Sequence, residues 1–366
     1  MINVASPIVG QKEKKLVTEV LNSKMLASGK YVQDFERSFA KYCGAKFGIA
    51  NANGTTALHT ALLISGVKAG DKVVTTPFSF IATSNSILFC GAKPVFCDID
   101  PETFNIDPVL LEKILKKEKN VKAVVIVHLY GLPCDMDAIL KLKKKYKFKL
   151  IEDACQAHGA QYKEKTAGSF GDAAAFSFYA TKNMMTGEGG ITLTNSAAAD
   201  KYARQIINHG RDGHSTFTVL GYNYRMTNIA AALGIAQLEQ LESRTEKRIS
   251  NADKYNEAFK NLDFIRTPII PLKCRHVFHQ YTVRIKAQER EKFMNYLKAN
   301  GVGCGIYYDC VLYNQPFYKK LGYKAGLCPR AEQAAKEVVS LPVHPSLSKA
   351  DAEKVIKTVL SYKRSL

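Results

Sequence analysis

The first half of the chain alternates short apolar runs with stretches in which apolar residues recur at helical spacing. The apolar runs predict strands at 47–50, 72–75, 94–98, 123–128, 149–153, 173–176 and 191–194. Most of these runs are nearly continuous, which indicates strands buried on both faces, as in a parallel sheet covered by helices. The helical spacing predicts helices at 11–21, 57–63, 83–89 and 136–144, and another through Phe35 and Phe39. We therefore expect an α/β fold with a mainly parallel sheet between helices.

The second half of the chain has a different pattern. A long helical pattern runs from Thr227 to Phe259, and we expect a break near Ser250. Beyond it the pattern predicts a strand at 277–285, a helix ending at Asn300, a short strand at 305–308, and helices at 330–340 and 350–362. We therefore expect two domains, a large one with an N-terminal arm at 1–250 and a smaller C-terminal α+β domain at 251–366.

A single lysine, Lys182, lies in the connection between the predicted strands 173–176 and 191–194. An ammonium group is costly to bury unless it is paired or its pKa falls. A lysine with a lowered pKa is a nucleophile toward aldehydes and can hold a cofactor as a Schiff base. The alternative is a surface loop whose lysine points into water.

Other polar groups follow the predicted strands at the edge where their carboxyl ends meet, which is where ligands bind in such sheets. The Gly54-Thr55-Thr56 turn opens a helix and suits a phosphate, although a threonine there could simply cap the helix. Asp153 could pair with a cationic ring nitrogen or could cap the next helix.

Ser177 adds a second hydroxyl for a phosphate, and Phe80 offers a face on which a flat ring can stack. A phosphate site, a carboxylate for a pyridinium, a stacking face and an imine-forming amine are the four features that pyridoxal phosphate (PLP) needs. One ligand therefore explains all of them.

Composition narrows the classes of function. Of the 366 residues 46% are hydrophobic and 23% are charged, as in an ordinary globular protein. There is no apolar run of membrane-spanning length and no signal-peptide pattern at the start, so we expect a cytoplasmic protein with no membrane partner. The net charge of +19 comes largely from lysine clusters at 116–119 and 141–149 that resemble solvated helix faces, and no nucleic-acid-binding motif is present.

The nine cysteines contain no C-x-x-C pair, and several lie in apolar segments, which indicates buried reduced thiols. His276 and His279 have a ligand-like spacing, but on the predicted strand they would point to opposite faces. We expect no metal site, and we expect His279 to be a core or interface histidine.

Taken together, the motifs resemble the DegT/StrS family of sugar-nucleotide aminotransferases over nearly the whole chain. The matching segments are 54–59, 76–83, 91–96, 128–131, 151–160, 177–190, 220–227 and 341–345. The resemblance implies a PLP enzyme of fold type I, a homodimer whose active sites lie at the subunit interface.

The resemblance also implies roles for individual residues. Lys182 matches the lysine that binds the cofactor and moves the proton, and Asp153 matches the carboxylate paired with the ring nitrogen. The resemblance also makes Thr55, Thr56 and Ser177 phosphate ligands, and it makes Gln156 the amide near the ring hydroxyl. Phe80 matches the stacking aromatic, and Asn223 matches an asparagine that reaches the cofactor of the partner subunit.

The chain departs from the family pattern at a few positions. Other members carry different residues at Thr56 and Phe80, an aspartate is common at Asn228, and Tyr179 replaces a histidine found in part of the family. Substrate contacts are expected from Tyr179 and from the segment 305–315, through three of its side chains: Tyr307, Tyr308 and Asn314.

The implied reaction moves the amino group of an amino acid, glutamate being the expected donor, to a nucleotide-diphosphate-linked ketosugar with its keto group at C3 or C4. The product would be an amino sugar for cell-surface polysaccharide or glycan. One alternative is a PLP-dependent sugar dehydratase, but in that branch a histidine replaces the lysine. The other is a regulatory or nucleic-acid-binding protein that keeps the fold without the chemistry, and the high positive charge motivates it.

Overall fold

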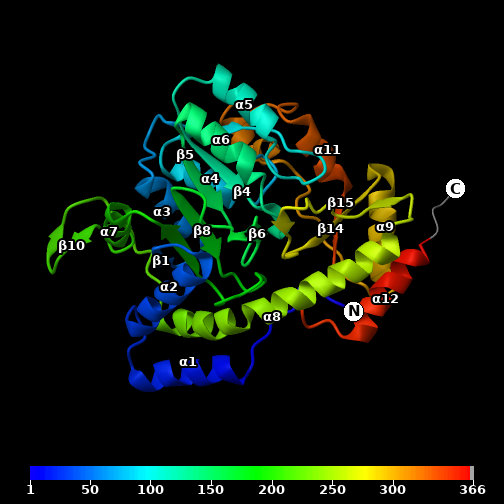
Figure 1. Ribbon diagram of the computed structural model, residues 1–366, viewed down its shortest axis with the longest axis horizontal. Coiled ribbons are helices and arrows are strands. Elements are labelled where there is room, and N and C mark those ends of the chain that lie inside the picture. The colour runs from blue at the N-terminus through cyan, green and yellow to red at the C-terminus, as the bar shows by residue number, and fades with distance from the viewer. Residues whose placement is uncertain (363–366) are drawn as a thin grey trace.

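A seven-stranded sheet forms the centre of the larger part of the molecule in the computed structural model, which describes residues 1–362 (Figure 1). The strand order is β1 (Phe47–Asn51), β9 (Gly190–Thr194), β8 (Ala173–Ser177), β5 (Lys149–Asp153), β4 (Val121–Val127), β2 (Lys72–Thr75) and β3 (Lys93–Phe96). Within this sheet β9 runs antiparallel to both of its neighbours, while β8, β5, β4, β2 and β3 pair in parallel. The predicted mainly parallel α/β sheet is confirmed.

Alternate residues of the central strands feed two different cores, because successive side chains of a strand point to opposite faces. On β4, Ala123 and Val125 pack with α3 (Gly54–Ile64) and α4 (Ala82–Phe89). Val124 and Ile126 pack with α5 (Pro108–Lys117) and α6 (Met136–Tyr146). On that second face α2 (Lys30–Cys43) covers β8 and β9, while α7 (Ala197–Ile206) contacts α3 and β1. Helices on both faces explain why the strand sequences are continuously apolar.

One edge of the sheet gathers the ends of several strands. Asn51 at the end of β1 and Ser177 at the end of β8 both lie opposite Gly190, and Asp153 at the end of β5 lies opposite Val127 at the end of β4. The predicted polar residues therefore meet at the carboxyl edge of the parallel strands, as expected for a ligand site.

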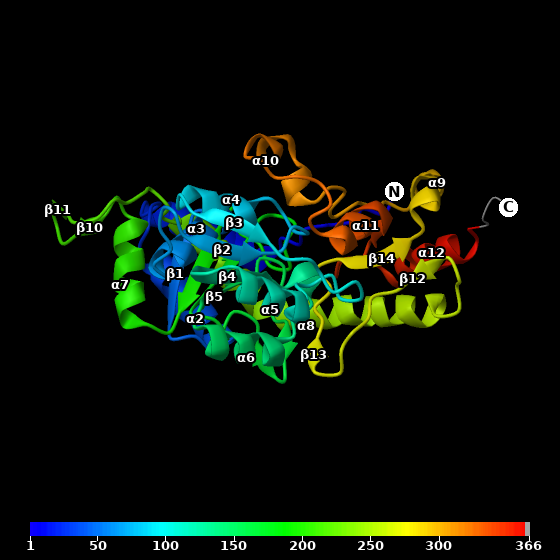
Figure 2. The same cartoon turned by 90° about the horizontal axis from the view of Figure 1, so that it is seen from above.

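A smaller part of the molecule contains β12 (Ile265–Arg266), β14 (Tyr281–Ile285) and β15 (Val338–Leu341), which form an antiparallel sheet. The helices α9 (Ala287–Ala299) and α12 (Lys349–Leu360) share an apolar core with this sheet and with the end of α8 (Asn228–Phe259). Both views show α8 running from beneath the larger part to the smaller one (Figures 1 and 2). The long helix therefore joins the two parts.

The remaining elements are short or peripheral. Helix α1 (Gln11–Ser23) packs on α8, and α10 (Pro316–Lys320), α11 (Pro329–Glu337) and the 3-10 turns η1 (Leu129–Gly131) and η2 (Leu312–Asn314) complete the helices. Two small sheets are formed by β6 (Gln161–Tyr162), β7 (Lys165–Thr166) and β13 (Cys274–Arg275), and by β10 (Arg211–Asp212) and β11 (Thr216–Phe217). In residues 1–362, none of the helices has the length and apolar character to cross a membrane.

Four predictions for the second half of the chain are wrong. Helix α8 is unbroken near Ser250, because the polar residues there make tertiary contacts: Arg248 Nη1 donates to the Phe278 carbonyl at 3.3 Å. The predicted strand 277–285 begins only at Tyr281, because Phe278 adopts a left-handed turn conformation (φ 44°). The helix predicted at 330–340 ends at Glu337, where the chain enters β15.

The segment 305–308 forms no strand. Its single ladder contact is a bridge between Gly305 and Ser340. The segment 311–338, which the sequence assigns to the C-terminal domain, packs against Phe78 and Phe96 of the larger part. The boundary at residue 250 stays a prediction, and residues 363–366 of the predicted second domain lie outside the described residues.

Candidate active site

A cavity of about 600 Å³ opens at the carboxyl edge of the large sheet. Segments far apart in the sequence line it, from α3 and α4 to the turn before β14 and the segment 307–308. It brings together nine of the predicted site residues: Thr55, Phe80, Asp153, Gln156, Ser177, Tyr179, Lys182, Tyr307 and Tyr308.

Lys182 lies in the connection between β8 and β9, where its backbone N–H donates to the Tyr179 carbonyl at 2.9 Å. Burial lowers the pKa of the Lys182 ammonium, and the neighbouring Cys155 and Asp153 oppose that shift. Burial also raises the pKa of the Cys155 thiol, so this neighbour stays uncharged at neutral pH. The lysine therefore has the lowered pKa that a nucleophilic amine needs.

Both oxygens of the Asp153 carboxylate are held by hydrogen bonds. The Thr83 hydroxyl donates to Oδ2 at 2.7 Å, and the Cys155 backbone N–H donates to Oδ1 at 3.2 Å. Thr83 in turn accepts from the Ser79 hydroxyl at 2.9 Å, because its own proton is used on Asp153. Asp153 is 4% exposed, so this carboxylate is fixed at the wall of the cavity rather than rotating in solvent.

The start of α3 forms a cradle for an anion. A Cβ on Gly54 would lie 2.5 Å from the Ser177 Cβ, so only glycine lets the helix end approach β8 this closely. The first N–H groups of a helix have no partner within it, and the hydroxyls of Thr55 and Ser177 flank them here.

Thr56 has a different role from Thr55. Its backbone N–H donates to the Asn53 side chain at 2.9 Å, and its hydroxyl donates to the Asn53 carbonyl at 2.9 Å. Asn53 and Thr56 cap the helix, and Thr56 does not line the cavity. The capping and phosphate interpretations of this turn therefore apply to different threonines.

Gln156 faces the aromatic wall of the cavity. Its Oε1 accepts from the Tyr130 backbone N–H at 2.8 Å, which fixes the amide so that Nε2 donates to the Tyr308 hydroxyl at 3.0 Å. The Phe80 ring is 56% exposed, with its centroid 6.3 Å from that of Tyr308. An exposed aromatic face beside a polar wall suits a flat ligand.

Besides Thr56, two further predicted residues lie outside the cavity. Asn223 is exposed and pairs through a bridge with Asn208, away from the cavity of its own chain. Asn314 belongs to the turn η2 and does not line the cavity.

The sequence analysis missed several residues that line the cavity. Thr83 was part of a matching motif, but nothing in the sequence indicated that it bonds Asp153. His279 is buried as expected, but it also reaches the cavity, and its Nδ1 lies 3.1 Å from Asn183 Oδ1 beside the lysine. Glu188, at the glycine-rich end of the lysine loop, also lines the cavity.

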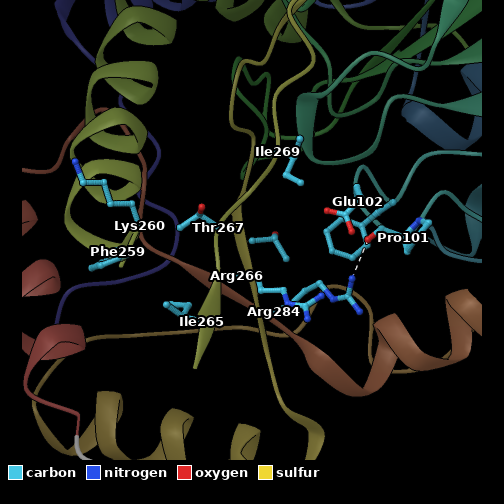
Figure 3. A pocket seen from close by; sticks show the side chains of 11 residues that line it. Pro101, Glu102, Phe259, Lys260, Ile265, Arg266, Thr267, Ile269 and Arg284 are labelled. Atoms are coloured by element: carbon cyan, nitrogen blue, oxygen red, sulfur yellow. Dashed lines mark hydrogen bonds between the residues drawn. The ribbon is translucent and has the colours of Figure 1, made fainter. Parts of the chain in front are cut away.

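A second cavity, of about 300 Å³, lies between the loop that precedes α5 and the strand β12 (Figure 3). Its Arg284 donates to the Pro101 carbonyl at 2.9 Å and forms an ion pair with Glu337 at 2.6 Å. None of the predicted site residues lines this cavity, so it is separate from the lysine site.

No group of three or more His, Cys, Asp or Glu side chains in residues 1–362 is arranged to hold a metal ion. The large cavity contains the Lys182 amine, the fixed Asp153 carboxylate, and the hydroxyls of Thr55 and Ser177.

The fold and the site define an α/β protein with a half-buried lysine and a fixed carboxylate in a cavity at the carboxyl edge of its sheet. Residues 7–360 match the DegT/DnrJ/EryC1/StrS aminotransferase family, and the chain belongs to that family. Membership of this family makes the chain an aminotransferase, as the resemblance predicted.

Individual relatives are similar over nearly their full length. A protein of Geobacillus stearothermophilus described as a pleiotropic regulatory protein is 40% identical, with 96% of this chain and 94% of that protein covered. GDP-perosamine synthase of Caulobacter vibrioides is 38% identical, with 97% and 96% covered. The solved PLP form of the putative sugar aminotransferase Spr1654 from Streptococcus pneumoniae is 26% identical, with 98% of this chain and 97% of that chain covered and a TM-score of 0.92.

Proposed function

We propose that this aminotransferase uses PLP to move the amino group of glutamate to the C3 or C4 keto group of a sugar linked to a nucleotide diphosphate. The product is an amino sugar for a cell-surface polysaccharide or glycan. The observation that carries the proposal is the Lys182 amine with its lowered pKa beside the fixed Asp153 carboxylate. The names of the relatives agree with this class of substrate.

The residues at the cavity fit PLP. The Thr55 and Ser177 hydroxyls at the start of α3 would hold its phosphate, Asp153 its ring nitrogen, and Gln156 its ring hydroxyl, with Phe80 against a ring face. Bound PLP supplies an aldehyde for amines and a protonated ring that takes up the electron pair left when a substrate carbon loses its proton.

The chain itself supplies proton transfer and orientation. Lys182 Nζ takes the proton from the substrate carbon as a base and returns it as an acid, and the desolvation that lowers its pKa favours the neutral amine that accepts the proton. Asp153 keeps its orientation through the Thr83 and Cys155 hydrogen bonds, so its carboxylate would stay directed at the ring nitrogen of the bound cofactor. The walls formed by Phe80 and Tyr308 limit access of water to the reacting carbon.

The proposal includes a homodimer with shared active sites. Its support is Asn223, which the family pattern assigns to the phosphate of a neighbouring subunit's cofactor. In this chain Asn223 is exposed and away from the cavity of its own subunit. Sedimentation of the purified protein measures whether it is a dimer. A mixture of the Asn223→Ala and Lys182→Ala variants then tests whether two defective chains restore activity together.

The first experiment is the absorbance spectrum of the purified protein, followed by addition of glutamate. We expect a yellow absorbance band that glutamate converts to the band of the pyridoxamine form. The yellow band should return when the correct ketosugar nucleotide is added from a panel of UDP, dTDP and GDP derivatives. Lys182→Ala should fold normally and lose turnover.

Three other outcomes would contradict the proposal. A released sugar without nitrogen would indicate a dehydratase, and full activity of Lys182→Ala would remove the lysine from the mechanism. A protein that stays colourless with PLP but binds DNA in a salt-sensitive manner would favour a regulatory role, for which the pleiotropic regulatory relative is a precedent in name.

A further inference from the structure

A strained backbone corner lies directly behind the cavity, at Tyr130 and Gly131. Tyr130 has a left-handed conformation (φ 58°, ψ 4°), which residues with a side chain seldom adopt, and it is 4% exposed. Gly131 follows with φ 95°, and a Cβ there would lie 2.7 Å from Val277 Cγ2 and 3.1 Å from the backbone nitrogen of His279. Such a conformation persists only where the surroundings hold it in place.

Tyr130 contacts three segments that each supply a wall of the cavity. Its backbone N–H donates to Gln156 Oε1 at 2.8 Å, and its carbonyl accepts from the Gln280 N–H at 3.4 Å. Its hydroxyl donates to the Tyr307 carbonyl. All three contact residues line the cavity: Gln156, Gln280 and Tyr307. Gln156 follows β5, Gln280 precedes β14, and Tyr307 belongs to the segment 305–308.

The contact with Tyr307 joins two parts of the molecule. Gln156 belongs to the large-sheet edge, whereas the segment 305–308 has a bridge to β15 of the smaller sheet. The Gln156 amide also donates to the Tyr308 hydroxyl at 3.0 Å. Tyr130 therefore fixes both ends of this connection, Gln156 through its backbone and Tyr307 through its hydroxyl.

The Tyr130 hydroxyl keeps its proton at physiological pH and so remains a donor. Burial raises the pKa of Tyr130, so its phenol stays protonated. The Tyr307 carbonyl is an acceptor only, which fixes the direction of the bond. Removing that hydroxyl would leave the wall at 307–308 without this tie to the large-sheet edge.

We propose that Tyr130 is a positioning residue for the sugar nucleotide, since it holds the Tyr307–Tyr308 wall in register with Gln156 and with the lysine site. The inference rests on the proposed function. A small amino donor reacts at the cavity floor beside Lys182 and Asp153. A nucleotide-linked sugar is much larger and has to extend along the aromatic wall, so its binding depends on where that wall lies.

The test is Tyr130→Phe, which keeps the ring and removes only the hydroxyl. The two half-reactions are measured separately by the change in visible absorbance, first with glutamate and then with the ketosugar nucleotide. We expect an unchanged donor half-reaction, and a KM for the sugar nucleotide raised about tenfold with little change in kcat, which corresponds to one lost hydrogen bond.

Tyr281→Phe is the matched control. Tyr281 is a buried tyrosine of β14 whose hydroxyl donates to Asn256 Oδ1 at 2.8 Å, and it does not line the cavity. It should leave both half-reactions unchanged, although it also removes one buried tyrosine hydroxyl.

A binding measurement gives a readout apart from turnover. Calorimetry with the cofactor-free protein and UDP, dTDP or GDP should show several-fold weaker binding of the preferred nucleotide to Tyr130→Phe and not to Tyr281→Phe. Equal effects on both half-reactions, or none on either, would overturn the role of Tyr130 while leaving the proposed function intact. A wild-type protein that reacts with glutamate and with no ketosugar nucleotide would overturn both.

Discussion

Thr83 shows how a residue outside the reacting set controls one inside it. Its hydroxyl donates to Asp153 Oδ2 at 2.7 Å, and the other carboxylate oxygen has only the longer 3.2 Å bond from the Cys155 N–H. Thr83→Val keeps the shape of the side chain but removes the shorter bond, so the carboxylate gains rotational freedom. We expect kcat/KM to fall at least about tenfold, because a hydrogen bond to a charged group contributes about 1.5 to 3 kcal/mol and about 1.4 kcal/mol corresponds to a factor of ten.

Steady-state kinetics with both substrates measure this loss, and titration with PLP shows whether cofactor affinity falls as well. Thr60→Val is the control, because Thr60 is equally buried and its hydroxyl donates to Asn51 Oδ1 at 3.0 Å, away from the cavity. If the two variants lose the same activity, the effect belongs to folding and not to the orientation of Asp153.

At the scale of residues, the sequence predicts the groups that carry chemistry better than the groups that position them. Lys182, Asp153 and Ser177 follow buried strands, and the strand pattern alone places them at one edge. Tyr130 acts through a left-handed turn and contacts at positions remote in sequence, which no local pattern reveals.

Asn228 is a second example of this limit. The family pattern favours aspartate here, and the sequence offered no reason for the change. In the structure its Nδ2 donates to the Met25 carbonyl at 2.7 Å, while its Oδ1 accepts from the Val32 N–H at 3.3 Å. An amide can make both bonds, whereas a carboxylate has no proton to donate.

At the scale of elements, α1 and α8 are joined by a buried polar network. Glu13 is fully buried and accepts from Gln237 Nε2 at 2.6 Å and from Arg244 Nη2 at 3.3 Å. Glu13→Ala would leave the Arg244 guanidinium, itself buried, without its carboxylate. We expect the free energy of unfolding to fall by about 3 to 5 kcal/mol, as when one partner of a buried pair is removed.

Urea unfolding of Glu13→Ala and Glu239→Ala makes the comparison direct. Glu239 forms an ion pair with Lys12 between the same two helices, but both side chains are about half exposed. Exposed pairs contribute about 0 to 1 kcal/mol, so Glu239→Ala should change little. Similar losses of unfolding free energy in the two variants would show that burial of the Glu13 network does not determine its contribution to stability.

Elements whose ends are set by tertiary contacts were the ones predicted least well. The sequence around Ser250 is polar enough to suggest a break in α8, yet Asn251 Nδ2 donates to the His344 carbonyl at 3.5 Å and the helix continues. Val338 was assigned to a helix, but it pairs with Arg284 of β14. In both cases a partner distant in sequence decides the local conformation.

At the scale of the whole molecule, the charge distribution agrees with the interpretation from sequence. The lysines of the cluster at 141–149 are mostly exposed. Several of them form ion pairs with acidic neighbours: Lys143 and Lys149 with Asp172, and Lys145 with Glu112. This is a solvated outer face with local counter-charges. The titration of buried groups could not be predicted in the same way, because it depends on the packing of both parts of the molecule.

Buried histidines give the whole molecule an acid-sensitive stability. Burial lowers the pKa of His59 to about 4 and that of His158 and His276 to about 3, and it lowers the pKa of His279 well below its ordinary value. The cations Lys182 and Arg248 add to this effect at His158 and His279. The folded state therefore keeps these rings neutral at pH values where the unfolded chain protonates them.

The sign of the pH dependence follows from this difference. Unfolded histidines have a pKa of about 6.5, so below that pH the unfolded state binds protons that the folded state excludes. The stability is fully present above about pH 6.5 and is lost as the pH falls toward the folded pKa values. At pH 5 one such histidine lowers the free energy of unfolding by about 2 kcal/mol, and several act together.

Urea unfolding at pH 8, 7, 6 and 5 should therefore give a free energy of unfolding that falls steeply below pH 6.5. His276→Asn should flatten the slope, because it removes one titrating ring while its amide oxygen can still accept the 3.1 Å hydrogen bond from the Phe278 N–H. His214→Gln, at an exposed position, should leave the slope unchanged. A stability that stays level or rises between pH 7 and 5 would mean that the folded protein protonates these histidines, and that the packing around them opens to water.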